Sequence, residues 1–558
     1  MKIKRPEGTV IVPVNGKKYV YKITDKRYLK EKKYNEDKRV CIGRMEDDIF
    51  MIPNARCREM FPELLVQEDA QAPVPECSDV LKVGAYIAID RVLEQTGLGE
   101  IIDNVYEGDS DMIKDVAAYM INSEDSVMQH FPSYEFEHPL FMPYQVNDSS
   151  VCEMLKRHTI AEHDRFLAEW NDIHAEKDGI YISYDSTNMN SAATGIEMLE
   201  FGHSKDDDSE FPQVNVSLAF DQDDATPLFY EIYPGSIIDN SQCSVMVEKA
   251  RKYGYKKIGF ILDRGYFSGE NIRYFEKNGF EFIMMAKGNA KFLKPVMKAI
   301  KIHHKLAPSL YIDEYDVFGT TVKKKLYEKD TRERYIHVYY DEVRGAEQRM
   351  SVIRRFSVYD KELAKMCEKK LTRKHNLKKY EKYYNMQFIS DYLVSFRRKD
   401  REIEKELEKC GYFVIITSEE MTAQEAIAKY RNRDSTEKQF MTEKSFLGGD
   451  TWRVHSDESL ESKQLTSFVA LIVRNEIFKS VSGLRAKDRK RYTVPAVIRE
   501  LDRIIMTRDR NGKFSMRYAL TATQKTILKQ LEIDQAYVKK MAGKIAKKYD
   551  SREPLVIN

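Results

Sequence analysis

The hydrophobic pattern of the first 175 residues changes period once. Apolar residues alternate over Thr9–Val14, Lys17–Ile23 and Lys38–Gly43, and Asn15-Gly16 separates the first two runs, which predicts short strands around a hairpin. The loop expected before the third run is rich in Lys and Arg. Over residues 78–173 the apolar positions recur at helical spacing. A small β region followed by a mainly helical region is therefore predicted.

From Tyr181 onward, apolar strand-like runs alternate with one helical run. Three adjacent strands followed by a strand–helix alternation predict a mixed sheet. We expect strands near 179–185, 213–220, 227–233, 257–263 and 280–286, and a helix near 243–252.

Between Gly288 and Met421 the pattern becomes irregular, which is typical of an insertion into a domain. Strand-like runs lie near 310–312, 335–340 and 411–417, and a long charged helical stretch covers about 361–409.

After this insertion the pattern is helical to the end of the chain. Thr422-Ala-Gln-Glu425 is a capping box that begins a helix carrying Tyr430 to Lys444. Residues 463–479 form a strongly apolar helix, and the tail from about Val481 is predicted to be helical with basic patches. The expected divisions are 1–64 (small β region), 65–175 (helical region), 176–290 and 421–480 (two parts of an α/β core), 291–420 (insertion) and 481–558 (helical tail).

Composition adds limits on compartment and partners. With 558 residues, of which 42% are hydrophobic, the chain can form several folded units. The formal net charge is only +2, so a nucleic-acid surface would have to come from local clusters of basic residues. Seven scattered cysteines without a Cys-x-x-Cys pair disfavour a zinc ribbon and a disulfide framework. No run approaches a membrane span, and we expect a soluble, cytoplasmic protein.

Three carboxylates are the strongest chemical signal. Asp185 closes one predicted strand, Asp263 closes another, and Glu437 falls on the predicted helix after the insertion. On that helix Tyr430, Arg433, Glu437 and Lys444 lie at offsets 0, 3, 7 and 14, within an arc of roughly 60° at ~100° per residue. An acid, two cations and an aromatic on one face indicate a polyanion and a metal nearby.

These residue types suit phosphodiester chemistry. Two Mg²⁺ or Mn²⁺ ions about 3.5–4 Å apart neutralise both the attacking and the leaving oxygen. Such hard cations bind carboxylate and water oxygens, so Asp185, Asp263 and Glu437 suffice as protein ligands. Arg433 and Lys444 can bind phosphate oxygens, and Tyr430 can donate to a phosphate or stack on a base.

Each of these features also has a purely structural interpretation. An aspartate at a strand end often caps the following turn, and a charged helix face is often only solvated. Asp206-Asp-Asp208 is expected to be a solvated turn, His303-His304 a surface pair, and His203 a structural residue. Among the basic clusters, the one at 369–382 is the best candidate for phosphate contact, because Tyr380, Tyr383 and Tyr384 are interleaved with it.

The combination resembles the bacterial insertion-sequence transposases of the DDE class. Tyr430, Arg433, Glu437 and Lys444 match the Tyr-x2-Arg-x3-Glu-x6-Lys signature of one group at every spacing. Further matching stretches are Tyr184-Asp-Ser-Thr-Asn, Gly202-His-Ser-Lys-Asp, Tyr233-Pro-Gly-Ser, Asp263-Arg-Gly-Tyr-Phe and Arg453-Val-His. The resemblance runs from roughly residue 10 to 530 and so covers nearly the whole chain. Relatives often carry Trp after the signature Arg, whereas this chain has Asp434, an additional carboxylate one turn from Glu437.

The resemblance implies an α/β fold with a ribonuclease-H-like mixed-sheet core, a β-rich insertion, N-terminal DNA-binding regions and a helical C-terminal tail. The first acid would lie on the first strand of the core, the second after the fourth strand, and the glutamate on a helix behind the insertion. Asp185, Asp263 and Glu437 would hold two Mg²⁺ or Mn²⁺ ions, and Tyr430, Arg433 and Lys444 would bind the terminal nucleotides.

The implied activity is that of a DNA transposase. Metal-activated water would nick the DNA, and the freed 3′ hydroxyl would attack another phosphodiester. The partners would be double-stranded DNA, both terminal inverted repeats and target, and a second copy of the chain in a homodimer; relatives in this group excise through a hairpin at the DNA end. Two alternatives stay open: an endonuclease of the same fold without strand transfer, and a catalytically inactive DNA-binding relative.

Overall fold

The structure is a computed structural model that divides into two compact units. One unit comprises residues 1–76 with 553–558, and the other comprises residues 77–552. The described residues are 3–14, 16–29, 34–46, 49–61, 77–175, 177, 179–202, 211–237, 239–255, 257–287, 296, 307–328, 330–369, 377–433, 447, 453–488 and 492–550.

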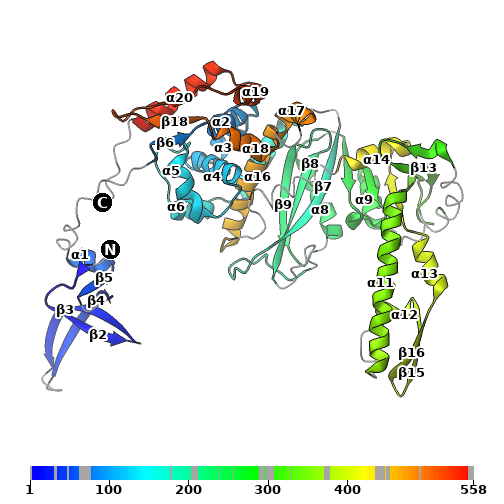
Figure 1. Ribbon diagram of the computed structural model, residues 1–558, viewed down its shortest axis with the longest axis horizontal. Coiled ribbons are helices and arrows are strands. Elements are labelled where there is room, and N and C mark those ends of the chain that lie inside the picture. The colour runs from blue at the N-terminus through cyan, green and yellow to red at the C-terminus, as the bar shows by residue number, and fades with distance from the viewer. Residues whose placement is uncertain are drawn as a thin grey trace. The chain divides into compact units, whose positions relative to one another are not determined.

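The N-terminal unit is built on a five-stranded antiparallel sheet in the order β1-β5-β4-β3-β2 (Figure 1). The predicted hairpin is confirmed, because β2 pairs with β3 from Thr9↔Lys22 to Val14↔Lys17. Gly16 at its tip has a φ of 75°, which glycine adopts at little cost. The pairing of β3 with β4 extends to Leu29↔Tyr34, into the segment expected to be a loop. The elements are β1 (Ile3–Lys4), β2 (Thr9–Val14), β3 (Lys17–Leu29), β4 (Tyr34–Met45), β5 (Phe50–Pro53) and α1 (Ala55–Met60).

The second unit begins with the helical region, which confirms that prediction. Its apolar positions are buried in one continuous core, and the entry to the last helix has a full capping box between Thr159 and Glu162. The elements are α2 (Gly84–Gln95), α3 (Leu98–Val105), α4 (Ser110–Ser123), η2 (Met128–His130), α5 (Phe131–Glu137), α6 (Asp148–Leu155) and α7 (Ile160–Asp172).

The C-terminal tail packs on this helical region and is mixed, whereas a helical tail was expected. Two short strands of the tail form a three-stranded sheet with β6 near the start of the unit, through Met506↔Leu81 and Thr507↔Ser515. Such short strands carry little periodic signal, and their partner is hundreds of residues away in the sequence. The elements are β6 (Val80–Lys82), α17 (Ser482–Lys487), α18 (Val494–Leu501), β18 (Ile505–Arg508), β19 (Phe514–Met516), α19 (Ala522–Gln530) and α20 (Gln535–Asp550).

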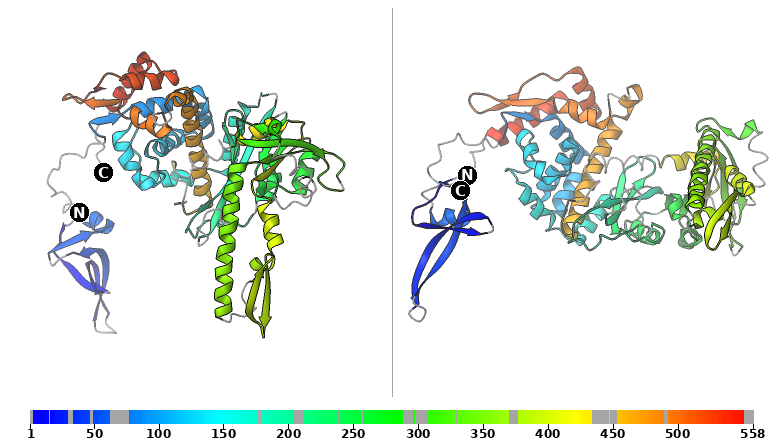
Figure 2. Two further views of the ribbon diagram at one scale, coloured as in Figure 1. Left: turned by 45° about the vertical axis from the view of Figure 1, so that its right-hand side comes forward. Right: turned by 60° about the horizontal axis from the view of Figure 1, so that its bottom comes forward.

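The apolar helix predicted at 463–479 is α16 (Asp457–Ser480), which runs through the helical region (Figure 2). It is buried around most of its circumference, from Leu465 to Ile477, because helices and the sheet edge at β9 surround it. Within the described residues, no helix combines the length and apolar character needed to cross a bilayer.

A nine-stranded mixed sheet forms the centre of the second unit, as predicted. Its order is β12-β13-β14-β17-β11-β10-β7-β8-β9, and β10 runs parallel to both β7 and β11. Every predicted strand of this segment is confirmed within a few residues. The elements from the first part of the sequence are β7 (Ile180–Asn190), β8 (Gln213–Asp221), β9 (Pro227–Pro234), α8 (Asp239–Lys252), β10 (Ile258–Leu262), η3 (Arg264–Tyr266), α9 (Gly269–Asn278) and β11 (Glu281–Met285).

Helices cover both faces of this sheet, which explains why the central strand β10 is apolar and buried throughout. On β10, Phe260 and Leu262 pack in the large core with α8 and α9. Ile261 points to the opposite face and packs with Ile427 and Tyr430 of α14 (Ala423–Arg431). The alternation along one strand thus separates the two cores, and α14 lies on the second face, over β11 and against β10, the strand that Asp263 follows.

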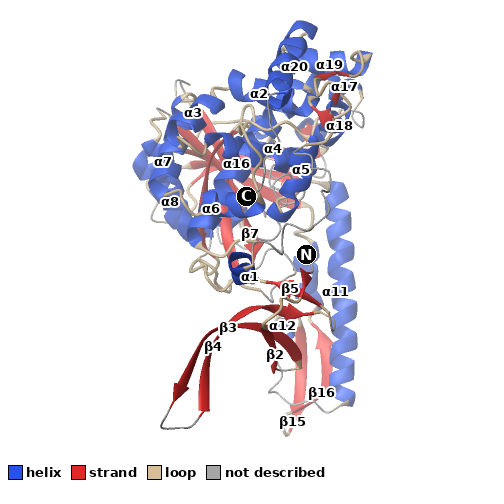
Figure 3. Ribbon diagram, turned by 90° about the vertical axis from the view of Figure 1, so that its left-hand side faces the viewer, coloured by secondary structure: helices blue, strands red, loops and turns tan. Residues whose placement is uncertain are grey.

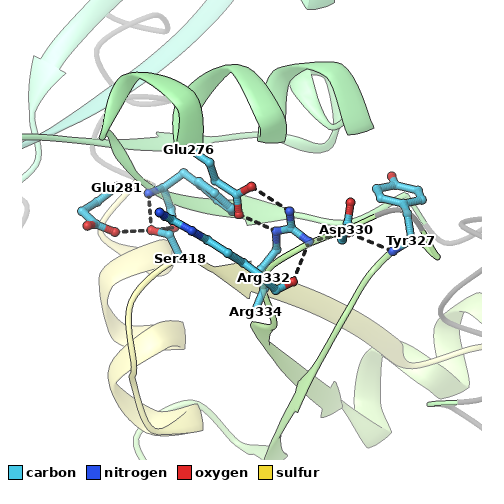
Figure 4. A network of polar contacts seen from close by, with 8 residues as sticks. Glu276, Glu281, Tyr327, Asp330, Arg332, Arg334 and Ser418 are labelled. Atoms are coloured by element: carbon cyan, nitrogen blue, oxygen red, sulfur yellow. Dashed lines mark hydrogen bonds and ion pairs between the residues drawn. The ribbon is translucent and has the colours of Figure 1, made fainter.

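Four strands from the expected insertion extend the core sheet. They are β12 (Tyr311–Ile312), which follows the short 3-10 helix η4 (Pro308–Leu310), β13 (Val317–Lys324), β14 (Arg334–Tyr340) and β17 (Tyr412–Thr417). Strand β17 is hydrogen-bonded between β11 and β14. A buried ion-pair network ties them to α9 (Figure 4). Arg334 donates to both carboxylate oxygens of Glu276 at 2.7 Å and also pairs with Asp330.

The remaining part of the insertion is an arm with its own small core (Figures 1 and 3). The long helix begins and ends earlier than expected, and a β-hairpin occupies part of the predicted helical stretch. Tyr380 and Tyr384 are buried in the arm, so these two tyrosines do not add an exposed aromatic surface to the basic cluster at 369–382. The elements are α11 (Glu342–Glu368), α12 (Lys378–Glu381), β15 (Tyr384–Ile389), β16 (Tyr392–Arg398) and α13 (Asp400–Leu407).

Candidate active site

Asp185 lies on β7, and Asp263 directly follows β10, the parallel neighbour of β7. The register of β10 on β7 ends with Leu262 opposite Tyr184, so the next residue on each strand is one of the two aspartates. The expectation that Asp185 ends its strand was wrong, because β7 continues to Asn190 and pairs with β8. The parallel register nevertheless brings together two acids that are far apart in the sequence.

The carboxylate of Asp263 is not used to cap the turn that follows it. Asp263 is the N-cap residue of η3, yet its side chain makes no capping hydrogen bond. The side chain is 33% exposed and accepts a hydrogen bond from the Tyr430 hydroxyl at 3.2 Å. The alternative that Asp263 serves only as a local cap is therefore wrong.

Tyr430 and Arg433 both reach the aspartates, from the end of α14. The predicted capping box at Thr422 and Glu425 is confirmed, but the helix ends at Arg431, and Arg433 lies in the turn after it. Arg433 Nη1 lies 3.3 Å from Asp185 Oδ2, and its Nη2 lies 4.0 Å from Asp263 Oδ1. One guanidinium group thus contacts both acids.

The two other members of the signature cannot be placed in the same way. Glu437 and Lys444 lie outside the described residues, as does Asp434. The same holds for His203, for Asp206 to Asp208 and for His303-His304. Within the described part of the chain, no three acidic, His or Cys side chains form a group that could hold a metal ion.

Burial and charge define the electrostatics of the pair. The Arg433 side chain is only 8% exposed, whereas that of Asp185 is 21% exposed. The Tyr430 ring lies 5.6 Å from the Arg433 guanidinium carbon. Burial, together with the nearby acids, raises the pKa of Tyr430 well above its usual value, so that its hydroxyl stays protonated and donates to Asp263.

The donor set fits hard divalent cations. Carboxylate oxygens are the protein ligands that Mg²⁺ and Mn²⁺ prefer, and one or two of them per ion are sufficient. Both carboxylates already converge on one positively charged group, Arg433, and both remain partly exposed to solvent. The two carboxylates can therefore attract cations to the point where β7 and the end of β10 lie next to each other.

Four residues that the sequence pattern did not single out take part in contacts that hold α14 against the sheet. The Lys429 ammonium lies 4.3 Å from the centroid of the Tyr181 ring on β7, and the Tyr181 hydroxyl donates to Glu419. The Gln222 side chain also donates to the Lys429 carbonyl at 3.2 Å. Apart from the proximity of Lys429 to Tyr430, the sequence carries no signal for these contacts, because each joins distant segments.

The fold and the site define a mixed α/β domain that presents paired acids just beyond the end of the parallel pairing of β7 with β10. This chain belongs to the transposase DDE domain family, whose profile matches residues 177–473. The resemblance inferred from the signature residues is confirmed. A search of curated protein sequences finds no match.

Solved structures give only distant similarities. A piggyBac transposase synaptic complex with hairpin DNA is 7% identical, with a TM-score of 0.37 over 83% of this chain and 82% of that one. A Mos1 mariner paired-end complex with Mn is 10% identical, with a TM-score of 0.14 over 41% of this chain and 68% of that one. A Mos1 transposase paired-end complex with the left transposon end is also 10% identical, at 0.14 over 41% and 67%. These TM-scores are too low to define a shared arrangement.

Proposed function

We propose that this protein is a DNA transposase that cleaves DNA at the ends of its own element and joins the freed 3′ hydroxyl to another phosphodiester. The observation that carries the proposal is the convergence of Asp185 and Asp263 with Tyr430 and Arg433 at one point of the sheet. Membership in the transposase DDE domain family supports it.

The proposed core is ribonuclease-H-like. Its support is the sheet order β9-β8-β7-β10-β11. Along the chain, the first of these strands, β7, carries the first acid, and the fourth, β10, is followed by the second acid. Strand β10 lies parallel to β7, whereas β8 and β9 are antiparallel to their neighbours. The long segment between β11 and α14 is consistent with the insertion that the family resemblance implies before the glutamate.

Asp185, Asp263 and Glu437 are the proposed ligands of two Mg²⁺ or Mn²⁺ ions. When bound, these ions supply charge neutralisation at the attacking and leaving oxygens of an in-line displacement. Arg433, Tyr430 and Lys444 are the proposed contacts to the terminal nucleotides. Arg433 suits this role because it carries a fixed positive charge and is already held at the two acids by the turn after α14.

The proposed partners are double-stranded DNA, as terminal inverted repeats and as target, and a second copy of the chain. The regions 1–64 and 65–175 are the proposed end-binding parts. Their support is their position in the sequence ahead of the core.

An in vitro reaction tests the proposal. The full chain is incubated with Mg²⁺, a labelled duplex that carries the terminal inverted repeat from the DNA flanking the gene, and a target plasmid. We expect nicked ends and covalently joined products, both absent for Asp185→Asn and Asp263→Asn. Nicks without joined products would support an endonuclease, and binding without any cleavage would support an inactive relative. A denaturing gel separates hairpin ends from open ones.

A further inference from the structure

Tyr266 joins the two chain segments that carry Asp185 and Asp263. It is the last residue of η3, three positions after Asp263, and its side chain is almost completely buried. Its hydroxyl donates to Ser186 Oγ at 3.2 Å, and Ser186 directly follows Asp185 on β7. A single side chain thus connects the turn after one acid to the strand that carries the other.

The Tyr266 ring makes a second contact on the other side of Asp185. It lies edge-on to the Tyr184 ring, with centroids 5.6 Å apart and planes at 66°. Tyr184 and Ser186 flank Asp185 on one strand, and side chains two positions apart share a face of the sheet. Tyr266 therefore contacts both neighbours of Asp185 from the face opposite to the Asp185 carboxylate.

Both ends of this connection are fixed by buried polar contacts. The Asn271 side chain donates to the Tyr266 carbonyl at 2.9 Å and so anchors η3 to α9. On β7, the Tyr184 hydroxyl donates to the buried carboxylate of Glu231 at 2.8 Å. Tyr266 consequently has little freedom to move relative to either segment.

Backbone pairing does not fix the position of Asp263 relative to β7. The pairing of β10 with β7 ends at Leu262↔Tyr184, one residue before the acids, so the ladder itself does not extend to Asp263. The Tyr266–Ser186 hydrogen bond lies beyond the end of the ladder and spans the same two segments.

We propose that Tyr266 is a positioning residue that sets the separation and orientation of Asp185 and Asp263, so that both carboxylates reach the same cations. This inference rests on the proposed function, because it assumes that the two acids bind divalent metal. Tyr266 acts through Ser186 and Tyr184 and touches no reacting group.

The test is the affinity of the full chain for Mn²⁺ alone, measured without DNA from the electron paramagnetic resonance signal of free Mn²⁺. We expect Tyr266→Phe and Ser186→Ala each to weaken binding about 10-fold, as the loss of a supporting contact behind a metal ligand typically does. The double variant should bind no more weakly than the single variants, because both remove the same hydrogen bond.

Tyr255→Phe is the matched control. Its hydroxyl is also buried and donates to Asn171 Oδ1 at 2.6 Å, far in sequence from both acids. This variant loses a comparable hydrogen bond, and its Mn²⁺ affinity should stay at the native value. If Tyr266→Phe does not fold, Ser186→Ala carries the test, since it removes only the acceptor.

Asp185→Asn distinguishes a failure of the proposed metal site from a failure of the positioning role of Tyr266. If Asp185→Asn weakens Mn²⁺ binding while Tyr266→Phe and Ser186→Ala bind as the native protein does, the positioning role is overturned and the metal site stands. If Asp185→Asn itself binds Mn²⁺ with native affinity, the proposed metal site is wrong, and the positioning role is overturned with it.

Discussion

Replacing Arg433 by Gln removes the positive charge that contacts both aspartates and keeps most of the side-chain volume. At an effective dielectric constant of about 20, unit charges roughly 3–4 Å apart interact by about 4–5 kcal/mol, and desolvation offsets most of this energy. Arg433 is nearly buried but Asp185 is 21% exposed, so solvent screens part of the interaction. We expect a net loss of about 1–2 kcal/mol in the free energy of unfolding.

The same substitution should make the protein respond more strongly to divalent cations. Without Arg433, two adjacent carboxylates repel each other, and a bound cation relieves that repulsion. A ligand present at about 100 times its Kd stabilises the folded state by about 2.7 kcal/mol. The rise in thermal midpoint on adding Mn²⁺ should therefore be larger for Arg433→Gln than for the native chain.

Thermal unfolding in chelator and at increasing Mn²⁺ concentration measures both effects. Arg165→Gln is the control, because Arg165 makes exposed contacts with Glu169 and with the Asn104 carbonyl, both at 2.9 Å. Its loss should cost under about 1 kcal/mol without changing the response to Mn²⁺. An Arg433→Gln variant that is as stable as the native chain in chelator, and gains no more from Mn²⁺, would refute the reasoning.

Three further outcomes follow from buried groups. Arg334→Met leaves the carboxylates of Glu276 and Asp330 without their cation, and denaturant unfolding should show a loss of about 3–5 kcal/mol in the free energy of unfolding. The control Arg251→Gln, which breaks an exposed pair with Glu248, should lose under about 0.5 kcal/mol. Burial raises the pKa of Glu461 from 4.5 to about 7, so its contribution to stability is present below pH 4.5 and is lost as pH rises to about 7. The free energy of unfolding of Glu461→Gln should thus exceed that of the native chain by about 1–3 kcal/mol at pH 8. A difference in the free energy of unfolding that does not change with pH would contradict this. Tyr430→Phe loses the hydrogen bond to Asp263, and end cleavage should slow about 10-fold in a single-turnover assay while thermal stability changes little; unchanged cleavage would exclude the role of the hydroxyl.

Local patterns predicted most of the secondary structure of the core. The runs at 179–185, 213–220 and 257–263 became β7, β8 and β10, because strands with at least one buried face carry apolar residues at every position or at alternate positions, whatever their neighbours are. The capping box at Thr422 likewise forms as expected, since all of its donors and acceptors lie within four residues. The acids Asp185 and Asp263 could be selected in the same way, from their place relative to predicted strand ends.

Errors arose where distant segments decide the local structure. The helix carrying Tyr430 was expected to continue to Lys444, but it ends at Arg431, and the following turn directs Arg433 onto the aspartates. Tyr380 and Tyr384 were expected to support phosphate contact by the basic cluster at 369–382, because they are interleaved with it. They are buried instead, because α11 and the β15–β16 hairpin fold over them.

By itself, the sequence determined the composition of the site: two acids next to apolar strands, and a tyrosine and an arginine three positions apart. It also determined the family, because the signature spacing is local to one segment. Only the tertiary structure decided that β10 lies parallel to β7 in the register that aligns Asp263 with Asp185, and that β17 enters the sheet between β11 and β14. Strand order and register depend on backbone hydrogen bonds between segments far apart along the chain. Any apolar strand can form such bonds, so no periodicity within a segment can specify its partner.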